Sequence, residues 1–396
     1  MGRPAILGGK PVCEKPIPFW SPSIIEQQDR VIRDFRRVLR SGRLVNGDFV
    51  RRLEERIASY LGVHNVVAVS SATSGLVLTL RLLLCGRPRN VLLPSFTFSP
   101  VGDSVLLAGG HPVFVDIQAD TLNLDLDDLK SKMSEEVGCI VATHTFGNPC
   151  SIDQILNVAK RQRVPVVFDA SHAFGSRYRG QLVGRFGIAE IFSLDAVKIL
   201  CGMKGGLVVT YDERLAEMLR LARNYGNSPE GKHLVCGLNA KMPEVCAVAA
   251  LASLSAVGDH ILSRKAIAED YLEGLGSLPG LQFQSIENGN TTNFQFFAIQ
   301  VEERTFGVSA ESLVKALAAE KIESRRYFCP PLHLSPVFSS GHVKLRMTEE
   351  VCRKLVCLPI FDGMKRKMVK RVCSAVSRMH EYAEELRNYQ NVKGHE

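Results

Sequence analysis

Short apolar runs separated by helix-length segments dominate the first half of this chain. The runs are rich in Val, Ile and Leu, lack polar alternation, and span residues 66–69, 91–93, 113–115, 140–142 and 166–168. Strands of this kind are buried on both faces, as in parallel sheets that helices cover on both sides. We therefore expect an α/β fold on a mainly parallel sheet up to about Thr210.

The pattern changes near residue 260. Before this point, helices are expected at Val50, Leu53, Ile57 and Leu61 and over 73–84, 152–161 and 243–257. After it, a strand over 294–301, a helix over 310–321 and a long helix from Met364 predict a smaller α+β unit. At 396 residues the chain also exceeds the size at which one core stops growing. We predict a large α/β domain over 1–260 and a small α+β domain over 261–396.

A carboxylate and a lysine follow two of the apolar segments. Asp169 ends the run 166–168, and Lys198 lies 29 residues later, shortly before the step Gly205-Gly206. Pyridoxal phosphate (PLP) chemistry requires such a pair. The lysine forms a Schiff base, and the carboxylate keeps the pyridinium nitrogen protonated so that the ring acts as an electron sink. The two residues therefore predict PLP as cofactor.

Two further segments supply what a phosphorylated, flat cofactor needs. Residues 70–75, Ser-Ser-Ala-Thr-Ser-Gly, lie between an expected strand and an expected helix, where N–H groups and hydroxyls can hold an anion. The alternative for this segment is a plain N-cap. Phe96 and Phe98 follow the run 91–93, so that either could stack on a ring or both could belong to the core. Because the chain lacks both a Walker lysine and a GxGxxG motif, no other nucleotide site competes.

Composition excludes several classes of protein. Hydrophobic residues make up 45% and charged residues 23%, which is ordinary for a globular enzyme. No stretch approaches about 18 uncharged apolar residues, and the start lacks an apolar signal core, so neither a membrane span nor export is expected. The 11 scattered cysteines predict reduced thiols in a cytoplasm. The net charge of +8 serves solubility or an anionic ligand. No basic-aromatic stripe indicates nucleic acid, and no metal site is expected.

Motifs spread over nearly the full length carry a family resemblance. They include Leu7-Gly8-Gly9-Lys10-Pro11, Ser71-Ala72-Thr73-Ser74-Gly75-Leu76, Pro94-Ser95-Phe96-Thr97-Phe98, Phe168-Asp169-Ala170-Ser171-His172-Ala173-Phe174-Gly175, Gly237-Leu238-Asn239-Ala240-Lys241-Met242 and Tyr327-Phe328-Cys329-Pro330-Pro331-Leu332-His333. In this order and spacing the chain resembles the DegT/DnrJ/EryC1/StrS family of PLP-dependent aminotransferases. The resemblance implies the aspartate-aminotransferase fold, with a large α/β and a small C-terminal domain, and a homodimer with shared active sites.

The resemblance assigns cofactor roles to several residues. It makes Lys198 the Schiff-base lysine and proton shuttle, and places Asp169 at the pyridine nitrogen. The remaining cofactor residues are His172 beside the ring, Thr73, Ser74 and Ser193 at the phosphate, Phe98 on the ring face, and Asn239 at the phosphate of the neighbouring subunit. For His172 the alternative is a core histidine satisfied by backbone, and for Asn239 it is simple helix capping.

The resemblance also implies residues that bind substrate. Tyr327 and His333 would line the substrate mouth. Lys241 stands where the family usually has an arginine and loses bidentate recognition; the alternative is a solvated lysine. Arg325 and Arg326 are either surface charges or contacts to a diphosphate, and of the two we predict Arg326 as the substrate contact.

One segment departs from the family pattern. The usual Gly-Glu-Gly-Gly reads Met203-Lys204-Gly205-Gly206 here, so that the charge near the site is reversed. No catalytic group is lost, and Lys198 argues against the dehydratases of the family, which lack the lysine. We expect an aminotransferase that moves an amino group, from glutamate by resemblance, to the ketone of a nucleotide-linked keto-deoxysugar. The alternatives are a cyclitol or aminobenzoate-type member, or a non-catalytic scaffold that keeps the fold.

Overall fold

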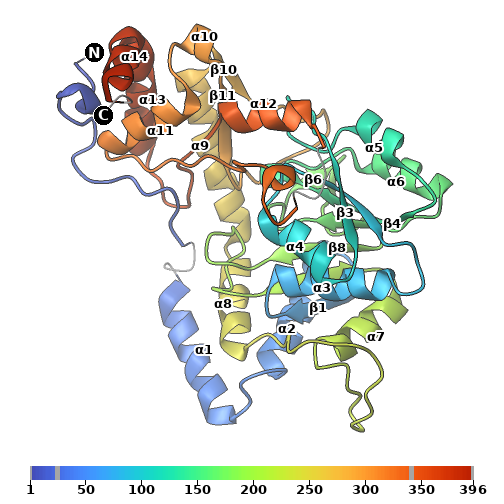
Figure 1. Ribbon diagram of the computed structural model, residues 1–396. Helices are drawn as coiled ribbons and strands as arrows, with labels where there is room; N and C mark the ends of the chain where they lie inside the picture. The colour runs from blue at the N-terminus through green and yellow to red at the C-terminus, as the bar shows by residue number, and fades with distance from the viewer. Residues whose placement is uncertain (1, 23–26, 339–342, 394–396) are drawn as a thin grey trace.

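A computed structural model describes residues 2–22, 27–338 and 343–393, and within them a seven-stranded sheet forms the centre of the molecule (Figure 1). Its order is β1-β9-β8-β5-β4-β2-β3. The strands are β1 (Asn65–Val69), β2 (Asn90–Pro94), β3 (His111–Val115), β4 (Val137–Thr143), β5 (Val166–Asp169), β8 (Ala189–Ser193) and β9 (Gly206–Thr210). Neighbours from β3 to β8 pair in parallel, whereas β9 is antiparallel to both β8 and β1. The predicted α/β fold with a mainly parallel sheet is confirmed.

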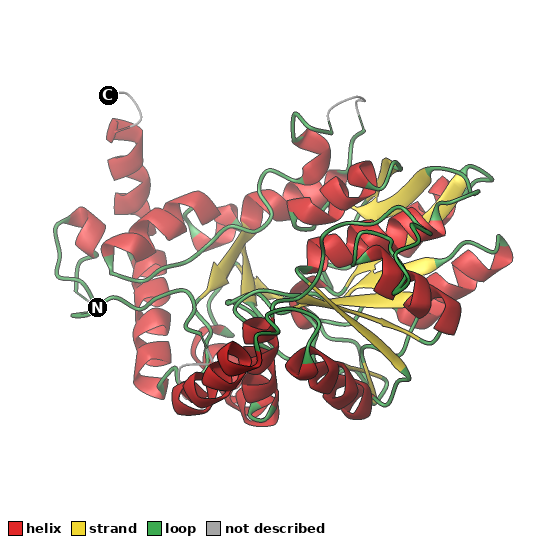
Figure 2. Ribbon diagram, turned by 90° about the horizontal axis from the view of Figure 1, so that it is seen from below, coloured by secondary structure: helices red, strands yellow, loops and turns green. Residues whose placement is uncertain are grey.

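Helices cover both faces of this sheet, as Figure 2 shows from below. One face packs on α3 (Ala72–Leu83), α4 (Ser99–Leu107) and α7 (Glu213–Ala222), and the other packs on α2 (Asp48–Leu61), α5 (Leu126–Lys132), α6 (Ile152–Arg161) and α8 (Glu244–Leu254). Successive side chains of β1 alternate between the two cores, with Val67 and Val69 on the α3 side and Val66 and Ala68 on the α2 side. Because both faces are buried, the strands contain almost only apolar residues.

The C-terminal part forms a smaller unit around an antiparallel sheet of order β10-β11-β12. Its elements are β10 (Leu281–Phe283), β11 (Phe297–Val301), β12 (Leu355–Leu358), α9 (Val257–Leu275), α11 (Ala310–Ala319), α12 (Arg346–Lys354), α13 (Arg366–Glu381) and α14 (Ala383–Lys393). The segment near the N-terminus, drawn beside α13 and α14 in Figure 1, packs on this unit. Cys13 and Ile17 lie in its core, and the Glu320 carboxylate accepts hydrogen bonds from the amides of Ala5 and Val12. The domain boundary at residue 260 stays a prediction; α9 runs through it without a break.

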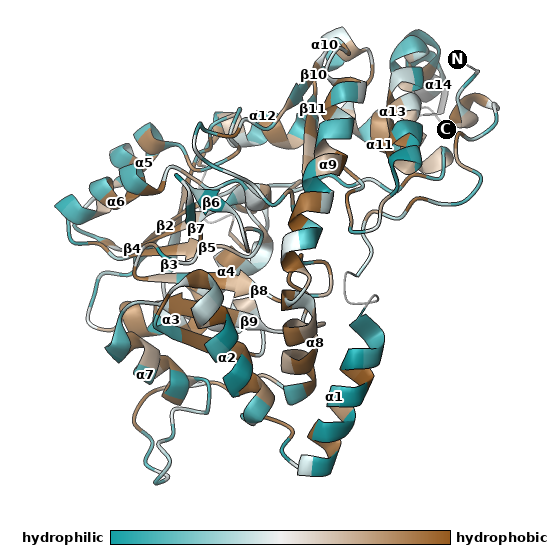
Figure 3. Ribbon diagram, turned by 180° about the vertical axis from the view of Figure 1, so that it is seen from behind, coloured by the Kyte–Doolittle hydropathy of each residue, from teal (hydrophilic) through white to brown (hydrophobic). Residues whose placement is uncertain are grey.

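The helix α8 is apolar over most of its length (Figure 3), since it packs against α1 and α2 and shares their hydrophobic core. By contrast, α1 (Gln28–Ser41) lies at the edge of the molecule, and Ile32, Phe35 and Leu39 are exposed on its surface. Among the described residues no single helix is long and apolar enough to cross a membrane. Only α8 and α9 taken together, bent by 61°, reach that length and composition.

Candidate active site

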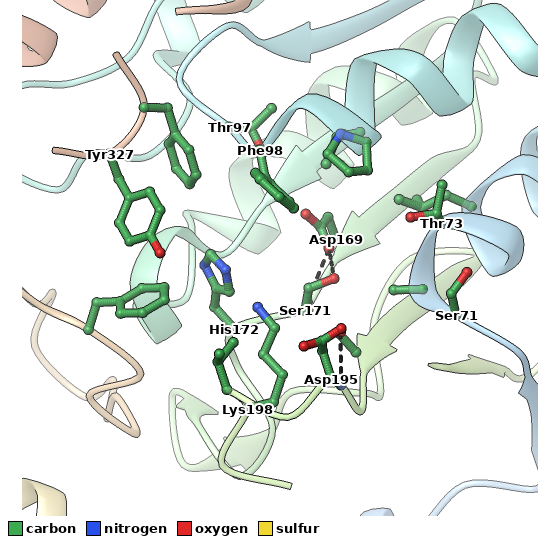
Figure 4. Close-up of a pocket in the computed structure, with 18 of the residues that line it drawn as sticks. Ser71, Thr73, Thr97, Phe98, Asp169, Ser171, His172, Asp195, Lys198 and Tyr327 are labelled. Carbon is green, nitrogen blue, oxygen red and sulfur yellow. Dashed lines mark hydrogen bonds between the residues drawn. The ribbon is translucent and has the colours of Figure 1, made fainter. Parts of the chain in front are cut away.

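A cavity of about 450 Å³ lies where the carboxyl ends of β5 and β8 face the smaller unit (Figure 4). Its lining includes the predicted residues Thr73, Phe98, Asp169, His172, Ser193, Lys198 and Tyr327. Clefts of this size hold small-molecule ligands, and in α/β sheets they form outside the carboxyl ends of the strands. The structure therefore gathers seven of the twelve predicted site residues in one place.

Asp169 is the last residue of β5 and is buried, with 4% of its surface exposed. Its Oδ1 accepts hydrogen bonds from the Ser171 amide (3.1 Å) and the Ser171 hydroxyl (2.5 Å). Burial raises the pKa of this carboxyl, whereas the Ser171 bonds and the charges of Lys198 and His144 pull the pKa down. A carboxylate held in this way is fixed in orientation before any ligand binds.

Lys198 lies in the turn that follows β8, and its side chain extends into the cavity toward His172 and Asp169. Removal from bulk solvent lowers the pKa of Lys198 to about 8, an effect that the charges of Asp169 and Asp195 partly oppose. A lysine with a pKa of about 8 carries a useful fraction of neutral amine near pH 7. Neutral amine is the form that attacks a carbonyl group.

The His172 imidazole lies beside Lys198 and is buried. Burial, with a contribution from the Lys198 charge, holds its pKa well below the usual value, so the ring is neutral. Its centroid lies 5.2 Å from that of Phe296 in an edge arrangement and 6.1 Å from that of Phe146 in a stacked one. The Nδ1 atom is buried and makes no hydrogen bond within the described residues. A buried polar atom without a partner is unusual in a folded protein and marks His172 as a candidate for a ligand contact.

The N-terminus of α3 forms the opposite wall of the cavity. Ser71 caps this helix, because its hydroxyl accepts from the Ser74 amide and the Ser74 hydroxyl accepts from the Ser71 amide. A Cβ atom on Gly206 would lie 2.4 Å from the Ala72 nitrogen, so only glycine lets β9 approach the helix this closely. The hydroxyl of Thr73 is left to line the cavity together with Ser193. The helix end therefore offers dipole and hydroxyls to an anion.

Phe98 stands at the rim of the cavity with 56% of its surface exposed, 6.4 Å from the Phe328 ring. By contrast, Phe96 is fully buried. Of the two phenylalanines that the sequence offered for stacking, only Phe98 reaches the cavity. A ring that is exposed to this extent at the rim can stack on a flat ligand.

Five predicted residues do not line the cavity. Ser74 is bound in the capping box of α3. Asn239 pairs with Asn224 through a backbone bridge, and the Lys241 Nζ lies 3.9 Å from the centroid of the Tyr225 ring. These two residues lie beyond the cavity of their own chain.

His333 and Arg326 are placed differently from the prediction. The His333 Nδ1 lies 2.7 Å from the Ser95 hydroxyl, and the ring is buried with 4% exposed. The Arg326 guanidinium donates to the carbonyls of Cys352 and Arg353. Neither side chain reaches the cavity, so a substrate contact by either one has no counterpart in the cavity lining.

Three charged residues of the cavity wall were not among the predicted site residues: Arg325, Asp195 and Lys204. Neighbouring residues of an extended segment point to opposite sides, and here Arg325 faces the cavity while Arg326 faces away. The Nη1 of Arg325 donates to the Tyr327 hydroxyl at 3.3 Å. Lys204, the residue that reverses the family's charge, forms an ion pair with Asp195. The sequence signalled Lys204 by its departure from the family, whereas nothing singled out Asp195.

A buried aspartate, a lysine of lowered pKa, a helix N-terminus and a rim phenylalanine in an α/β fold define a PLP-dependent transferase of the aspartate-aminotransferase type. The residues fit PLP, since the cavity offers a group for each part of the molecule: Lys198 for the aldehyde, Asp169 for the ring nitrogen and Thr73 for the phosphate. The chain belongs to the DegT/DnrJ/EryC1/StrS aminotransferase family, whose model matches residues 26–377. This confirms the family, the enzyme class and the cofactor expected from the sequence.

Related proteins match over nearly the whole chain. A UDP-4-amino-4-deoxy-L-arabinose–oxoglutarate aminotransferase of Shewanella sediminis (strain HAW-EB3) is 29% identical over 91% of this chain and 97% of its own. The GDP-perosamine synthase of Escherichia coli O157:H7 is 27% identical, over 92% and 99%. Among solved structures, DesI in the presence of its TDP-sugar product is 32% identical with a TM-score of 0.90, covering 98% of both chains.

Proposed function

We propose that this protein transfers an amino group from an amino acid, glutamate by family resemblance, to the keto group of a nucleotide-linked sugar. The observation that carries the proposal is the Lys198 amine in one cavity with the Asp169 carboxylate, bounded by the N-terminus of α3. The relatives named above act on or make nucleotide-linked sugars by their names. A reducing cytoplasm remains part of the proposal; all 11 cysteines are free.

Each residue has a defined task in this proposal. PLP, when bound, supplies the electron sink that stabilises negative charge at the carbon attached to the amino nitrogen. Lys198 would hold the cofactor. Its amine, neutral in part near pH 7, would then take the proton from that carbon and deliver it to the cofactor carbon on the other side of the amino nitrogen. Asp169 keeps the ring nitrogen protonated, and His172 fixes the ring edge. Arg325 stands at the entrance, where a substrate phosphate can meet its guanidinium.

The test uses purified protein with PLP and L-glutamate, followed by a panel of nucleotide-linked keto-sugars. We expect formation of 2-oxoglutarate and then of an aminated nucleotide sugar. Lys198→Ala should lower turnover by several powers of ten while the fold persists. Lys265→Ala is the control, since this exposed lysine on α9 pairs only loosely with Glu269 at 3.9 Å.

The outcomes separate the alternatives. Amination of keto-cyclitols but of no nucleotide sugar would move the protein to the cyclitol branch of the family. Absence of bound PLP and of any amino transfer would favour a scaffold. Full turnover in Lys198→Ala would disprove the assignment of Lys198 and direct attention to Lys204, which also lines the cavity.

A further inference from the structure

We propose that Gln295 and Asn293 are positioning residues that hold the turns carrying Lys198 and His172 at the junction of the two units. The inference rests on the proposed functions of Lys198 and His172. Both residues lie in the segment that connects β10 to β11. Neither side chain lines the cavity, and both act through the backbone of its residues.

Gln295 forms hydrogen bonds with the backbone on both sides of Lys198. Its side chain is buried, with 1% exposed, and uses both polar groups. The Nε2 donates to the Val197 carbonyl at 2.8 Å, and the Oε1 accepts from the Ile199 amide at 3.2 Å. One side-chain amide therefore fixes the peptide units before and after Lys198. On the opposite side of the same turn, the hydroxyl of Ser253 accepts from the Cys201 amide at 3.0 Å.

Asn293 forms similar hydrogen bonds with the backbone of the turn that carries His172. Its side chain is fully buried, and its Nδ2 donates to the carbonyls of His172 and Phe174, each at 2.9 Å. Its Oδ1 accepts from the backbone amide of Gln295 at 2.9 Å, so the two positioning residues are hydrogen-bonded to each other. A Cβ atom on Gly147 would lie 2.1 Å from this Oδ1, so the close fit depends on a glycine opposite.

The segment that carries both amides is itself anchored. The Arg264 guanidinium of α9, 2% exposed, donates to the carbonyls of Phe294 and Gln295 and pairs with Asp362 at 3.1 Å. Phe294 has φ 50°, a conformation that costs a bulky residue energy and persists only where surrounding contacts enforce it. Strain of this kind is concentrated at functional sites. The adjacent Phe296 then places its ring against the His172 imidazole.

These contacts give the segment a consequence for catalysis. A proton moves to and from Lys198 only if its amine lies within hydrogen-bond reach of the reacting carbon. Loss of the two Gln295 hydrogen bonds releases both peptide units next to Lys198. A displacement of the amine by about 1 Å can lower the rate on the order of a hundredfold. Substrate contacts lie elsewhere in the cavity, so we expect kcat to fall more than KM rises.

The experiment compares Gln295→Met with Gln300→Met. Methionine keeps the length and volume of glutamine and removes its hydrogen bonds. Gln300 is a matched control, because it is buried in the nearby strand β11 with 6% exposed and donates to the Ala119 carbonyl at 2.7 Å, away from the cavity. Three quantities are measured: amide hydrogen exchange of peptides spanning 195–201, the pH dependence of the absorbance of bound PLP, and the steady-state kcat and KM.

We expect Gln295→Met to accelerate exchange at the Ile199 amide, shift the pH midpoint of the absorbance and lower kcat by about ten- to a hundredfold at similar KM. Gln300→Met should change none of these. Unaltered exchange and absorbance in Gln295→Met, or equal effects in both variants, would overturn the proposal.

Two further measurements keep the test decisive. If Gln295→Met folds poorly, Gln295→Leu replaces it, since leucine is also apolar and forms neither the bond to Val197 nor the bond to Ile199. Hydrogen exchange does not require turnover. Faster exchange in Gln295→Met, together with full activity of Lys198→Ala, would therefore refute the proposed function of Lys198 but not the positioning role of Gln295. Unchanged exchange in Gln295→Met would refute that positioning role.

Discussion

At the scale of single residues, Asp169 is the group whose charge should matter most. Asp169→Asn keeps the shape of the side chain and removes the negative charge that faces the cofactor nitrogen. We expect PLP to remain bound, while the glutamate half-reaction slows by on the order of a hundredfold or more. Stopped-flow absorbance after mixing with glutamate measures this rate. An unchanged rate would make Asp169 a structural residue and remove the electron-sink argument.

Lys198 should destabilise the protein that has been stripped of PLP. Its pKa is about 8 in the folded chain, whereas the ordinary value of 10.5 applies to the unfolded chain. Between pH 8 and 10.5 the unfolded chain therefore binds more protons than the folded chain. The penalty for the desolvated, half-buried ammonium is fully present below pH 8 and disappears as the pH rises to 10.5. The shift corresponds to roughly 3 kcal/mol.

The matching variant is Lys198→Met, which removes the ammonium and keeps an unbranched side chain. We expect a higher Tm than the parent at pH 7, and a difference that shrinks between pH 8 and 10.5. Thermal unfolding of both apo-proteins over this pH range measures it. A difference that is constant with pH would show that packing, not charge, separates them.

At the scale of elements, the start of α3 separates helix capping from anion binding. The sequence left these alternatives open for residues 70–75, and the structure shows both. Ser71 and Ser74 form the capping box, and Ser71 also lines the cavity, whereas Thr73 lines the cavity and takes no part in the capping box. Ser71→Ala should lower the free energy of unfolding by about 0.5–2 kcal/mol. Thr73→Val should leave stability nearly unchanged but speed PLP loss on dialysis. The reverse pattern, seen in urea unfolding and cofactor retention, would exchange the two roles.

The elements themselves could be predicted well where apolar runs are short and continuous. The run 166–168 became β5, and the helix expected over 152–161 is α6 (Ile152–Arg161). The strand expected from residue 294 begins at Phe297, because Phe294 adopts a positive φ. The side-chain amides of Asn293 and Gln295 also bond to the turns that carry His172 and Lys198. Tertiary contacts of this kind leave no periodic signal.

The cavity could be predicted in part for the same reason. Lys198 and Asp169 were found because both follow apolar segments, and such positions meet at one edge of a parallel sheet. Arg325 and Arg326 could not be told apart, since the choice depends on which face of an extended segment meets the cavity. His333 carries the family motif, yet its bond to Ser95 holds the motif to the end of β2.

At the scale of the whole molecule, the cavity depends on both units. The carboxyl ends of the large sheet supply Asp169 and Lys198, while Arg325 and Tyr327 come from the part of the chain that follows α11. The segment around Gln295 contacts both parts. Its backbone accepts a hydrogen bond from Arg264 of α9, and its side chain donates to the Val197 carbonyl beside Lys198. A relative movement of the two units would therefore change the position of Lys198 and the substrate entrance together.

The last prediction concerns two copies of the chain. Asn239 does not line the cavity of its own chain, and the family resemblance makes it part of the partner's site. If so, a dimer of one Lys198→Ala subunit and one Asn239→Ala subunit has one cavity with both defects and one with neither. We expect such mixtures to recover activity above either parent, toward a quarter of wild type for random exchange. Mixtures of differently tagged Lys198→Ala subunits are the control. Mixed dimers shown to form by tag pull-down, yet without recovery, would mean that Asn239 only serves its own chain.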